Sequence, residues 1–209
     1  LAVNALHVLM RRGAATRDLN AFLRRSGDGN PLGATIHHLI AQGDSQSGNY
    51  LRSFLNLGFN QDELGARVFD GMNPNIAARQ LAMNIRFAAP SGAAEMYEPG
   101  SEGVLWWSDY VDERRGRKAA SLLTRCRVTE TCPKIVETFG SAEFYSLRMS
   151  PDLVGTRADI DIPLPPNVRR YYSPGVRHGG GGGGFEVEGK TDNCCVLASN
   201  PNPSTDLNR

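Results

Sequence analysis

The chain has 209 residues, of which 40% are hydrophobic and 22% are charged, and its formal net charge is +1. A chain of this length and composition can bury the core of a single domain. The near-neutral charge gives no indication of a nucleic acid or an anionic membrane as a partner. No run of about 18 or more apolar residues predicts a transmembrane helix.

The first 25 residues carry apolar side chains at helical spacing. Gly13 is expected to divide this segment into two helical pieces, with Thr16 as the N-cap of the second. Residues 26–31 are rich in Gly, Asn, Asp and Pro and predict a loop. The chain begins at Leu1 without a charged-then-apolar leader, so we expect any targeting signal to be absent from it.

An apolar, strand-like run over residues 35–41 leads into the hexapeptide GDSQSG at residues 43–48, and a helical pattern follows. A strand, a sharp turn with a serine at its apex and a helix together make a nucleophile elbow. The strained apex demands small residues two positions before and after the serine, and Gly43 and Ser47 meet this demand around Ser45. A chance serine-rich turn is the alternative interpretation.

Three further strand-like runs follow the elbow, at residues 68–74, 134–140 and 167–172. Because helical or loop segments separate these runs, the pattern predicts βαβ units and a mostly parallel sheet in an α/β fold. Residues 77–125 mix small residues, glycines, prolines and charges, and they are expected to leave the core as a cap-like or lid-like insertion. The core would then consist of residues 1–76 and 126–209.

An α/β-hydrolase presents its catalytic residues in the chain order Ser, acid, His. His178 stands in a glycine-rich loop shortly after the last strand-like run. Such a loop offers little packing reason to hold an imidazole, so we predict His178 as the general base. The other histidines are expected to be structural: His7, His37 and His38.

Glu143 closely follows the strand-like run at residues 134–140, and we predict it as the acid. Glu137 lies within that run, where its side chain is expected to be buried or to point away, and Asp159 lies later in a proline-rich loop. The alternative for Glu143 is a carboxylate in the first turn of a helix, stabilised by the helix dipole, with Ser141 as the N-cap.

These residues predict a serine hydrolase that cleaves a small-molecule or polymer-borne carboxylic ester through an acyl-enzyme. The backbone N–H of Gln46, the residue after the nucleophile, would donate one hydrogen bond to the oxyanion. Trp106 and Trp107 are expected to line the acyl or alcohol pocket, and an aromatic core is the alternative role for both. The sequence predicts no cofactor and no metal ion.

The four cysteines allow three two-bridge pairings: Cys126, Cys132, Cys194 and Cys195. Adjacent cysteines are poorly placed to bridge each other, so bridges from the first two to the last two are favoured. A zinc site is the rival interpretation, although the spacing lacks a C-x-x-C pair and a nearby histidine. The even count favours disulfides and an oxidising location, secreted or periplasmic, but an intracellular protein can also carry four thiols.

Several motifs together resemble a family of bacterial α/β-hydrolase-domain proteins. They are Arg17-Asp18-Leu19, the run from Gly43 to Asn60, Val68-Phe69-Asp70-Gly71, Cys132-Pro133-Lys134 and His178-Gly179. The resemblance covers nearly the whole chain and implies Ser45 as nucleophile, His178 as base and Glu143 as acid. It implies no known substrate.

The family fold has four strands before the strand that leads to the nucleophile, whereas only residues 1–34 precede that strand here. We therefore expect a sheet that lacks its N-terminal strands and the second oxyanion donor, unless another chain completes it. Two other functions stay open. One is a non-catalytic, truncated α/β-hydrolase-like domain for binding or structure, and the other is acyl transfer to an alcohol.

Overall fold

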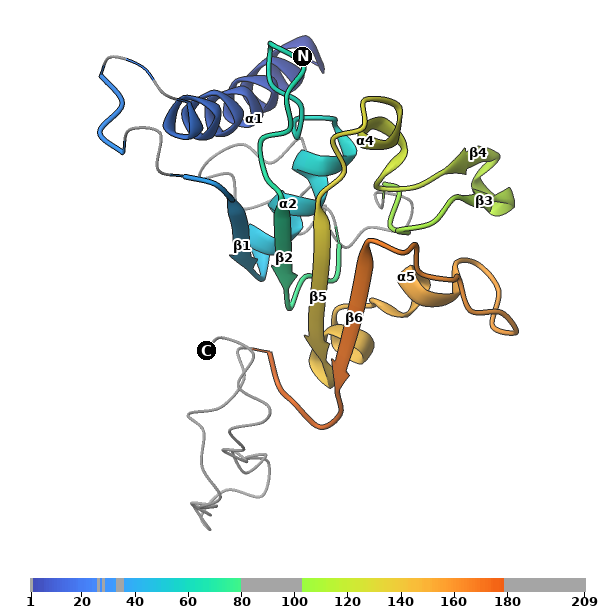
Figure 1. Cartoon of the computed structure of the whole chain (residues 1–209). Helices are drawn as coiled ribbons and strands as arrows, with labels where there is room; N and C mark the ends of the chain where they lie inside the picture. Colours follow the sequence, from blue (N-terminus) through green and yellow to red (C-terminus); the bar gives the residue numbers. More distant parts are fainter. Residues whose placement is uncertain (1, 26, 28, 33–35, 80–102, 179–209) are drawn as a thin grey trace, which may run out of the picture.

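The computed structural model describes residues 2–25, 27, 29–32, 36–79 and 103–178, with side chains from residue 13 onward. In this part of the chain four parallel strands form a sheet in the order β1-β2-β5-β6 (Figure 1). Their bounds are Ile40–Asp44 for β1, Gly71–Asn75 for β2, Lys134–Gly140 for β5 and Val168–Ser173 for β6. The predicted α/β class with a mostly parallel sheet is confirmed.

The helices are α1 (Ala2–Arg24), α2 (Gln46–Asn56), α4 (Thr124–Val128) and α5 (Ser150–Val154). Two short helical turns, η1 (Glu113–Arg115) and η2 (Ala142–Ser146), complete the helical part of the described residues. Strands β3 (Tyr110–Asp112) and β4 (Arg117–Ala120) form a separate antiparallel pair. None of the described helices is both long enough and apolar enough to cross a membrane.

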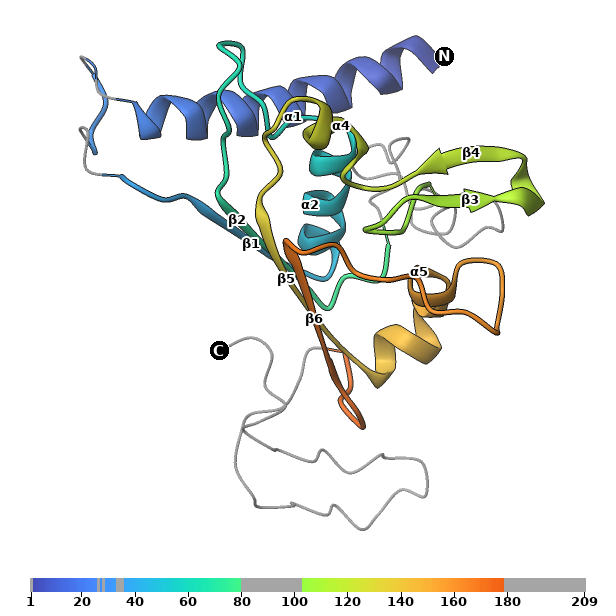
Figure 2. The same cartoon turned by 45° about the vertical axis from the view of Figure 1, so that its right-hand side comes forward.

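The main hydrophobic core lies between α2 and one face of the sheet. Each strand contributes one buried residue to it: Ala41, Met72, Ile135 and Val168. From α2 the core receives Leu51, Phe54 and Leu55. Seen from the side in Figure 2, α2, α4 and the β3–β4 pair lie on the same side of the sheet. The apolar face of α2 thus fixes the helix that begins directly after Ser45.

The opposite face of the sheet carries exposed apolar side chains among the described residues. Ile40 of β1 is 72% exposed, Val136 of β5 43% and Tyr171 of β6 56%. Side chains alternate along β1, where Ala41 and Gly43 are buried and their neighbours are exposed. Among the described residues, helices and loops therefore cover one face of the sheet only.

Two predicted strands begin later than expected. The run at residues 35–41 becomes β1 only from Ile40, and the run at 68–74 becomes β2 only from Gly71. Ile40 and Gly71 are register partners, so the parallel ladder between β1 and β2 begins at this pair. The strand at residues 134–140 has the predicted bounds, and β6 is displaced by one residue.

The expected break at Gly13 is wrong, because α1 continues through it. A Cβ atom at position 13 would lie 2.3 Å from the ring of Phe59, so glycine lets the helix rest against this ring. Thr16 is likewise not an N-cap: its hydroxyl oxygen lies 2.7 Å from the hydroxyl oxygen of Tyr50. Tertiary contacts thus keep as one helix what local propensity would divide.

Part of the insertion expected at residues 77–125 packs into the core. Trp107, Leu122 and Leu123 belong to the same buried cluster as α2 and the sheet. Residues 80–102 lie outside the described part of the chain, so the division into core and cap stays a prediction.

The favoured cysteine pairing is wrong, because Cys126 and Cys132 form a disulfide with each other, with their Cα atoms 4.8 Å apart. After α4 the chain turns back at Glu130, which has a φ of 57°, and the amide of Thr131 donates to the carbonyl of Cys126. This reversal brings the two thiols together. Cys194 and Cys195 lie outside the described residues.

Candidate active site

Ser45 occupies a strained turn between β1 and α2. Its φ is 54° and its ψ is −115°, a backbone conformation that non-glycine residues rarely adopt. The Ser45 amide donates to the carbonyl of Asn75 at 3.0 Å, and the Ser45 carbonyl accepts from the amide of Asn49 at 2.9 Å. The turn is therefore held by β2 on one side and by α2 on the other.

Close backbone approach at this turn explains two of its glycines. A Cβ atom at Gly43 would lie 2.5 Å from the carbonyl oxygen of Ser47, as the elbow interpretation requires. A Cβ atom at Gly48 would lie 2.7 Å from the Cβ of Ala77. Gly48 was not among the residues predicted to shape the turn, although its position at the end of the hexapeptide was a usable signal.

The structure brings together the three residues predicted for catalysis. Oγ of Ser45 lies 2.8 Å from Nε2 of His178, and Nδ1 of His178 lies 2.6 Å from Oε1 of Glu143. The Glu143 side chain is fully buried, whereas the His178 side chain is 40% exposed. A hydroxyl, an imidazole and a carboxylate thus form one hydrogen-bonded chain that runs from the surface into the protein.

Glu143 is positioned by the end of β5 and the first turn of η2. The amide of Gly140 donates to Oε2 of Glu143 at 2.6 Å, which leaves Oε1 for the imidazole. A Cβ atom at Gly140 would lie 2.9 Å from the Cβ of Val176, so glycine here allows the histidine loop to approach. The carboxylate therefore lies in a first helical turn and also contacts His178.

Ser141 does not cap the turn that carries Glu143, as the alternative interpretation expected. Its hydroxyl oxygen instead accepts from the amide of Gly175 at 2.7 Å and lies 2.8 Å from the hydroxyl of Tyr172. The amide of Ala142 donates to the carbonyl of Val176. These contacts join the loop of the acid to the loop of the histidine, and no sequence pattern indicated them.

A chain of side-chain hydrogen bonds crosses the carboxyl ends of three strands beneath Ser45. The buried Asn75 donates through Nδ2 to Oδ1 of Asp44 at 2.8 Å, and Thr138 donates to Oδ1 of Asn75 at 2.6 Å. Carboxyl ends of parallel strands are the usual place for a site in an α/β sheet. Asn75 was not predicted as a site residue, although it directly follows the strand-like run at residues 68–74.

Gln46 is the first residue of α2, where helical N–H groups have no acceptor within the helix. Its amide is thus located where an oxyanion donor was predicted. Within the described residues β1 is the first strand, so the second donor expected from the resemblance, which would follow an earlier strand, is not among them.

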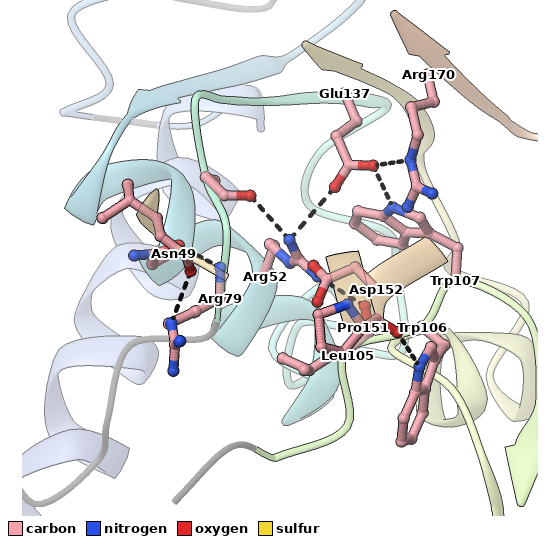
Figure 3. Close-up of polar contacts among 12 residues, drawn as sticks. Asn49, Arg52, Arg79, Leu105, Trp106, Trp107, Glu137, Pro151, Asp152 and Arg170 are labelled. Atoms are coloured by element: carbon pink, nitrogen blue, oxygen red, sulfur yellow. Dashed lines mark hydrogen bonds and ion pairs between the residues drawn. The ribbon is translucent and has the colours of Figure 1, made fainter. Parts of the chain in front are cut away.

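Trp106 and Trp107 are 3% and 2% exposed and both use their indole N–H inside the protein (Figure 3). Trp106 donates to the carbonyl of Pro151 at 2.8 Å, and Trp107 donates to Oε2 of Glu137 at 2.9 Å. These contacts favour the core role over the pocket role that we expected for both residues. In the described ranges, no group of three or more His, Cys, Asp or Glu side chains could hold a metal ion.

A parallel sheet with a strained serine between strand and helix, faced by a histidine and a carboxylate from later loops, defines an α/β protein of the hydrolase type. The chain belongs to the family described as alpha/beta hydrolase domain, whose model matches residues 14–205. No curated protein and no solved structure gives a significant match. The resemblance inferred from the motifs is thereby confirmed at the level of the family.

Proposed function

We propose that this chain hydrolyses carboxylic esters through an acyl-enzyme on Ser45. The observation that carries the proposal is the 2.8 Å contact between Oγ of Ser45 and Nε2 of His178. As Oγ attacks the ester carbonyl carbon, Nε2 takes the hydroxyl proton. The imidazolium then gives that proton to the leaving alcohol. Water, deprotonated by the same imidazole, releases the acid and restores the serine.

Glu143 holds the imidazole in the tautomer that this cycle needs. With the proton on Nδ1 donated to Oε1 of Glu143, Nε2 is left as the base that faces Ser45. The carboxylate also stabilises the imidazolium that forms during attack. Because Glu143 is fully buried, little water competes for this contact.

The negative charge of the tetrahedral intermediate would be stabilised at the start of α2. The amide of Gln46 and the positive end of the helix dipole lie at this point. Loss of one such donor typically costs about 3 kcal/mol of transition-state stabilisation. Acyl transfer to an alcohol would use the same residues and would differ in the nucleophile that resolves the acyl-enzyme.

Labelling with a fluorophosphonate probe tests the proposal, together with hydrolysis of short-chain nitrophenyl esters. Ser45→Ala should abolish both. Ser47→Ala in the same hexapeptide is the matched control and should retain both, since Ser47 is exposed in the first turn of α2. Unchanged labelling of the Ser45→Ala variant would refute the assignment. A folded wild-type chain that neither labels nor hydrolyses esters would favour the non-catalytic domain.

We further propose that the chain works in an oxidising compartment, secreted or periplasmic. The disulfide between Cys126 and Cys132 supports this, because cytosolic thiols are usually kept reduced. Non-reducing peptide mapping of the protein from its native source tests the location: a linked pair supports it, and two free thiols would contradict it.

A further inference from the structure

A fully buried guanidinium lies on the same helix as the elbow and has no place in the chemistry above. Arg52 of α2 is 0% exposed, and its side chain contacts four acceptors (Figure 3). Nη1 donates to the carbonyl of Ala77 at 2.8 Å and to Oε1 of Glu137 at 3.4 Å. Nη2 donates to the carbonyl of Leu105 and to Oδ2 of Asp152, each at 2.6 Å.

The charges around Arg52 form a cluster with two carboxylates and a second cation. Oε2 of Glu137 accepts from Nε of Arg170 at 2.6 Å, and the guanidinium of Arg52 lies 5.5 Å from the ring centre of Trp107. Taking such charges out of water is costly, and apolar residues of similar volume would often give equal stability. The geometry that the cluster imposes on its partners therefore explains its presence better than a gain in stability does.

One branch of the cluster leads to the segment that carries Glu143. The amide of Asp152, in α5, donates to the carbonyl of Met149 at 2.8 Å, and the amide of Met149 donates to the carbonyl of Glu143 at 3.0 Å. Met149 is fully buried against Phe139. One ion pair and two main-chain hydrogen bonds thus connect Arg52 to the backbone of the predicted acid.

The other branch leads into the sheet. Glu137 is a residue of β5, which is already fixed by its ladders to β2 and β6. The two carboxylates that receive the same guanidinium therefore differ in what they hold. Asp152 anchors a short helix outside the sheet, and Glu137 anchors a strand that has its own support.

We propose that Arg52 is a positioning residue that, through Asp152, sets the place of Glu143 relative to the helix that begins after Ser45. This inference rests on the proposed serine-hydrolase function. Because α2 is rigid over its 11 residues, a fixed Arg52 also fixes the elbow at its N-terminus. The ion pair joins the two sides of the site at a point that is closed to solvent.

The variants Arg52→Met, Arg52→Lys and Asp152→Asn test the proposal. Rates are compared above pH 7, where Asp152 is ionised, because burial raises the pKa of its carboxyl to about 7. There Asp152→Asn keeps the side-chain volume and removes the charge, and Arg52→Lys keeps the charge and removes the planar fork. We expect kcat to fall between about 10-fold and 100-fold with Arg52→Met and Asp152→Asn, as for small displacements of a catalytic group. KM should change less than about threefold, and Arg52→Lys should recover part of kcat.

The hydrogen bond between Nδ1–H of His178 and Oε1 of Glu143 gives a readout that does not require turnover. A short hydrogen bond to a carboxylate moves the proton NMR signal of an imidazole N–H downfield, so a displaced Glu143 should move this signal upfield in Arg52→Met and in Asp152→Asn. A variant that loses stability alone would leave the signal unchanged.

Two control variants separate positioning from stability. Val68→Ala truncates a residue of the main core that is 1% exposed. It is the control for a general loss of stability, and it is compared with Asp152→Asn at the same loss of unfolding free energy. Glu137→Gln removes the charge of the second carboxylate that pairs with Arg52, the one in β5. Both should leave the Nδ1–H signal of His178 in place, and kcat should fall less than with Asp152→Asn.

The proposal is overturned if folded Asp152→Asn keeps the wild-type kcat and the wild-type Nδ1–H signal of His178, or if Val68→Ala changes both by as much as Asp152→Asn does. If Arg52→Met does not fold, Arg52→Lys and Asp152→Asn decide the matter. A wild-type chain without activity would refute the proposed function. An upfield shift of the Nδ1–H signal of His178 in Asp152→Asn would then still support the positioning of Glu143, so the two failures are distinguishable.

Discussion

The main-chain carbonyl of Asn75, the last residue of β2, accepts a hydrogen bond of 3.0 Å from the amide of Ser45 at the apex of the elbow. The side chain of Asn75 simultaneously bridges Asp44 and Thr138. Asn75 therefore holds the strained backbone of Ser45 by a hydrogen bond, and its side chain connects three neighbouring strands near their carboxyl ends.

Asn75→Ala should lower the free energy of unfolding by about 1–3 kcal/mol, because it leaves the partners of a buried amide unpaired. Labelling of Ser45 should also slow. Asn73→Ala on the same strand is the control, since Oδ1 of Asn73 has no partner among the described residues, and its effect should stay within about 0.5 kcal/mol. Denaturant unfolding measures both, and equal losses would contradict the bridging role of Asn75.

Glu143→Gln should reduce kcat for ester hydrolysis by about 10²-fold to 10⁴-fold. The neutral amide no longer stabilises an imidazolium and does not select the required tautomer of His178. Asp159→Asn is the control, because Asp159 is an exposed carboxylate that pairs with Arg157. It is also the alternative acid that lies later in the chain than Glu143. Steady-state rates of both variants check the assignment, and an equal loss in the two would remove Glu143 from its role.

Asp152 predicts a specific dependence of stability on pH. Burial, reinforced by the charge of Glu137 and opposed by Arg52, raises the pKa of Asp152 from 3.8 to about 7. Between these two values the folded chain holds a proton that the unfolded chain has released. The free energy of unfolding should therefore fall as pH rises through this window, by at most about 1.4 kcal/mol per pH unit.

Urea unfolding of the wild type and of Asp152→Asn at several pH values checks this sign. The variant has no carboxyl at position 152, so its stability should vary less between the two pKa values. If the difference in stability between the wild type and Asp152→Asn stays constant across this window, Asp152 is ionised in the folded protein and the prediction is wrong.

Reduction of the disulfide should lower the free energy of unfolding by about 2 kcal/mol, the entropic value for closing a short loop. Cys126 and Cys132 are separated by only six positions, so the loop between them is small. Unfolding with and without a reducing agent measures the effect. The double variant Cys126→Ala/Cys132→Ala should lose the sensitivity to reductant that comes from this bond, and undiminished sensitivity would assign it to other cysteines.

The proximity of Ser45, Glu143 and His178 could be predicted because each follows a strand-like run closely. Parallel strands bring such positions to one edge of the sheet, so the order of residues along the chain carries three-dimensional information. The elbow added a local requirement for small neighbours, which Gly43 meets. The role of the three residues in catalysis remains a prediction.

The buried cluster around Arg52 had no comparable signal. Its partners come from four separate segments, and nothing local to Arg52 distinguishes it from an arginine on a solvated helix face. The same reason explains the error at Gly13, where a tertiary contact with Phe59 decides the outcome. At Cys126 the reversal is local, but it depends on a left-handed conformation at Glu130, which a non-glycine residue rarely adopts.

Arg52 donates hydrogen bonds to the carbonyls of Ala77 and Leu105, so one side chain joins two points of the backbone that are far apart in the sequence. The entropy cost of closing the segment between them grows only slowly with its length. The side chain of Arg52 therefore holds the two carbonyls at a fixed separation, and the length of the chain that joins them has little effect on that cost. The helix that begins after Ser45 thus fixes both ends of the joining segment.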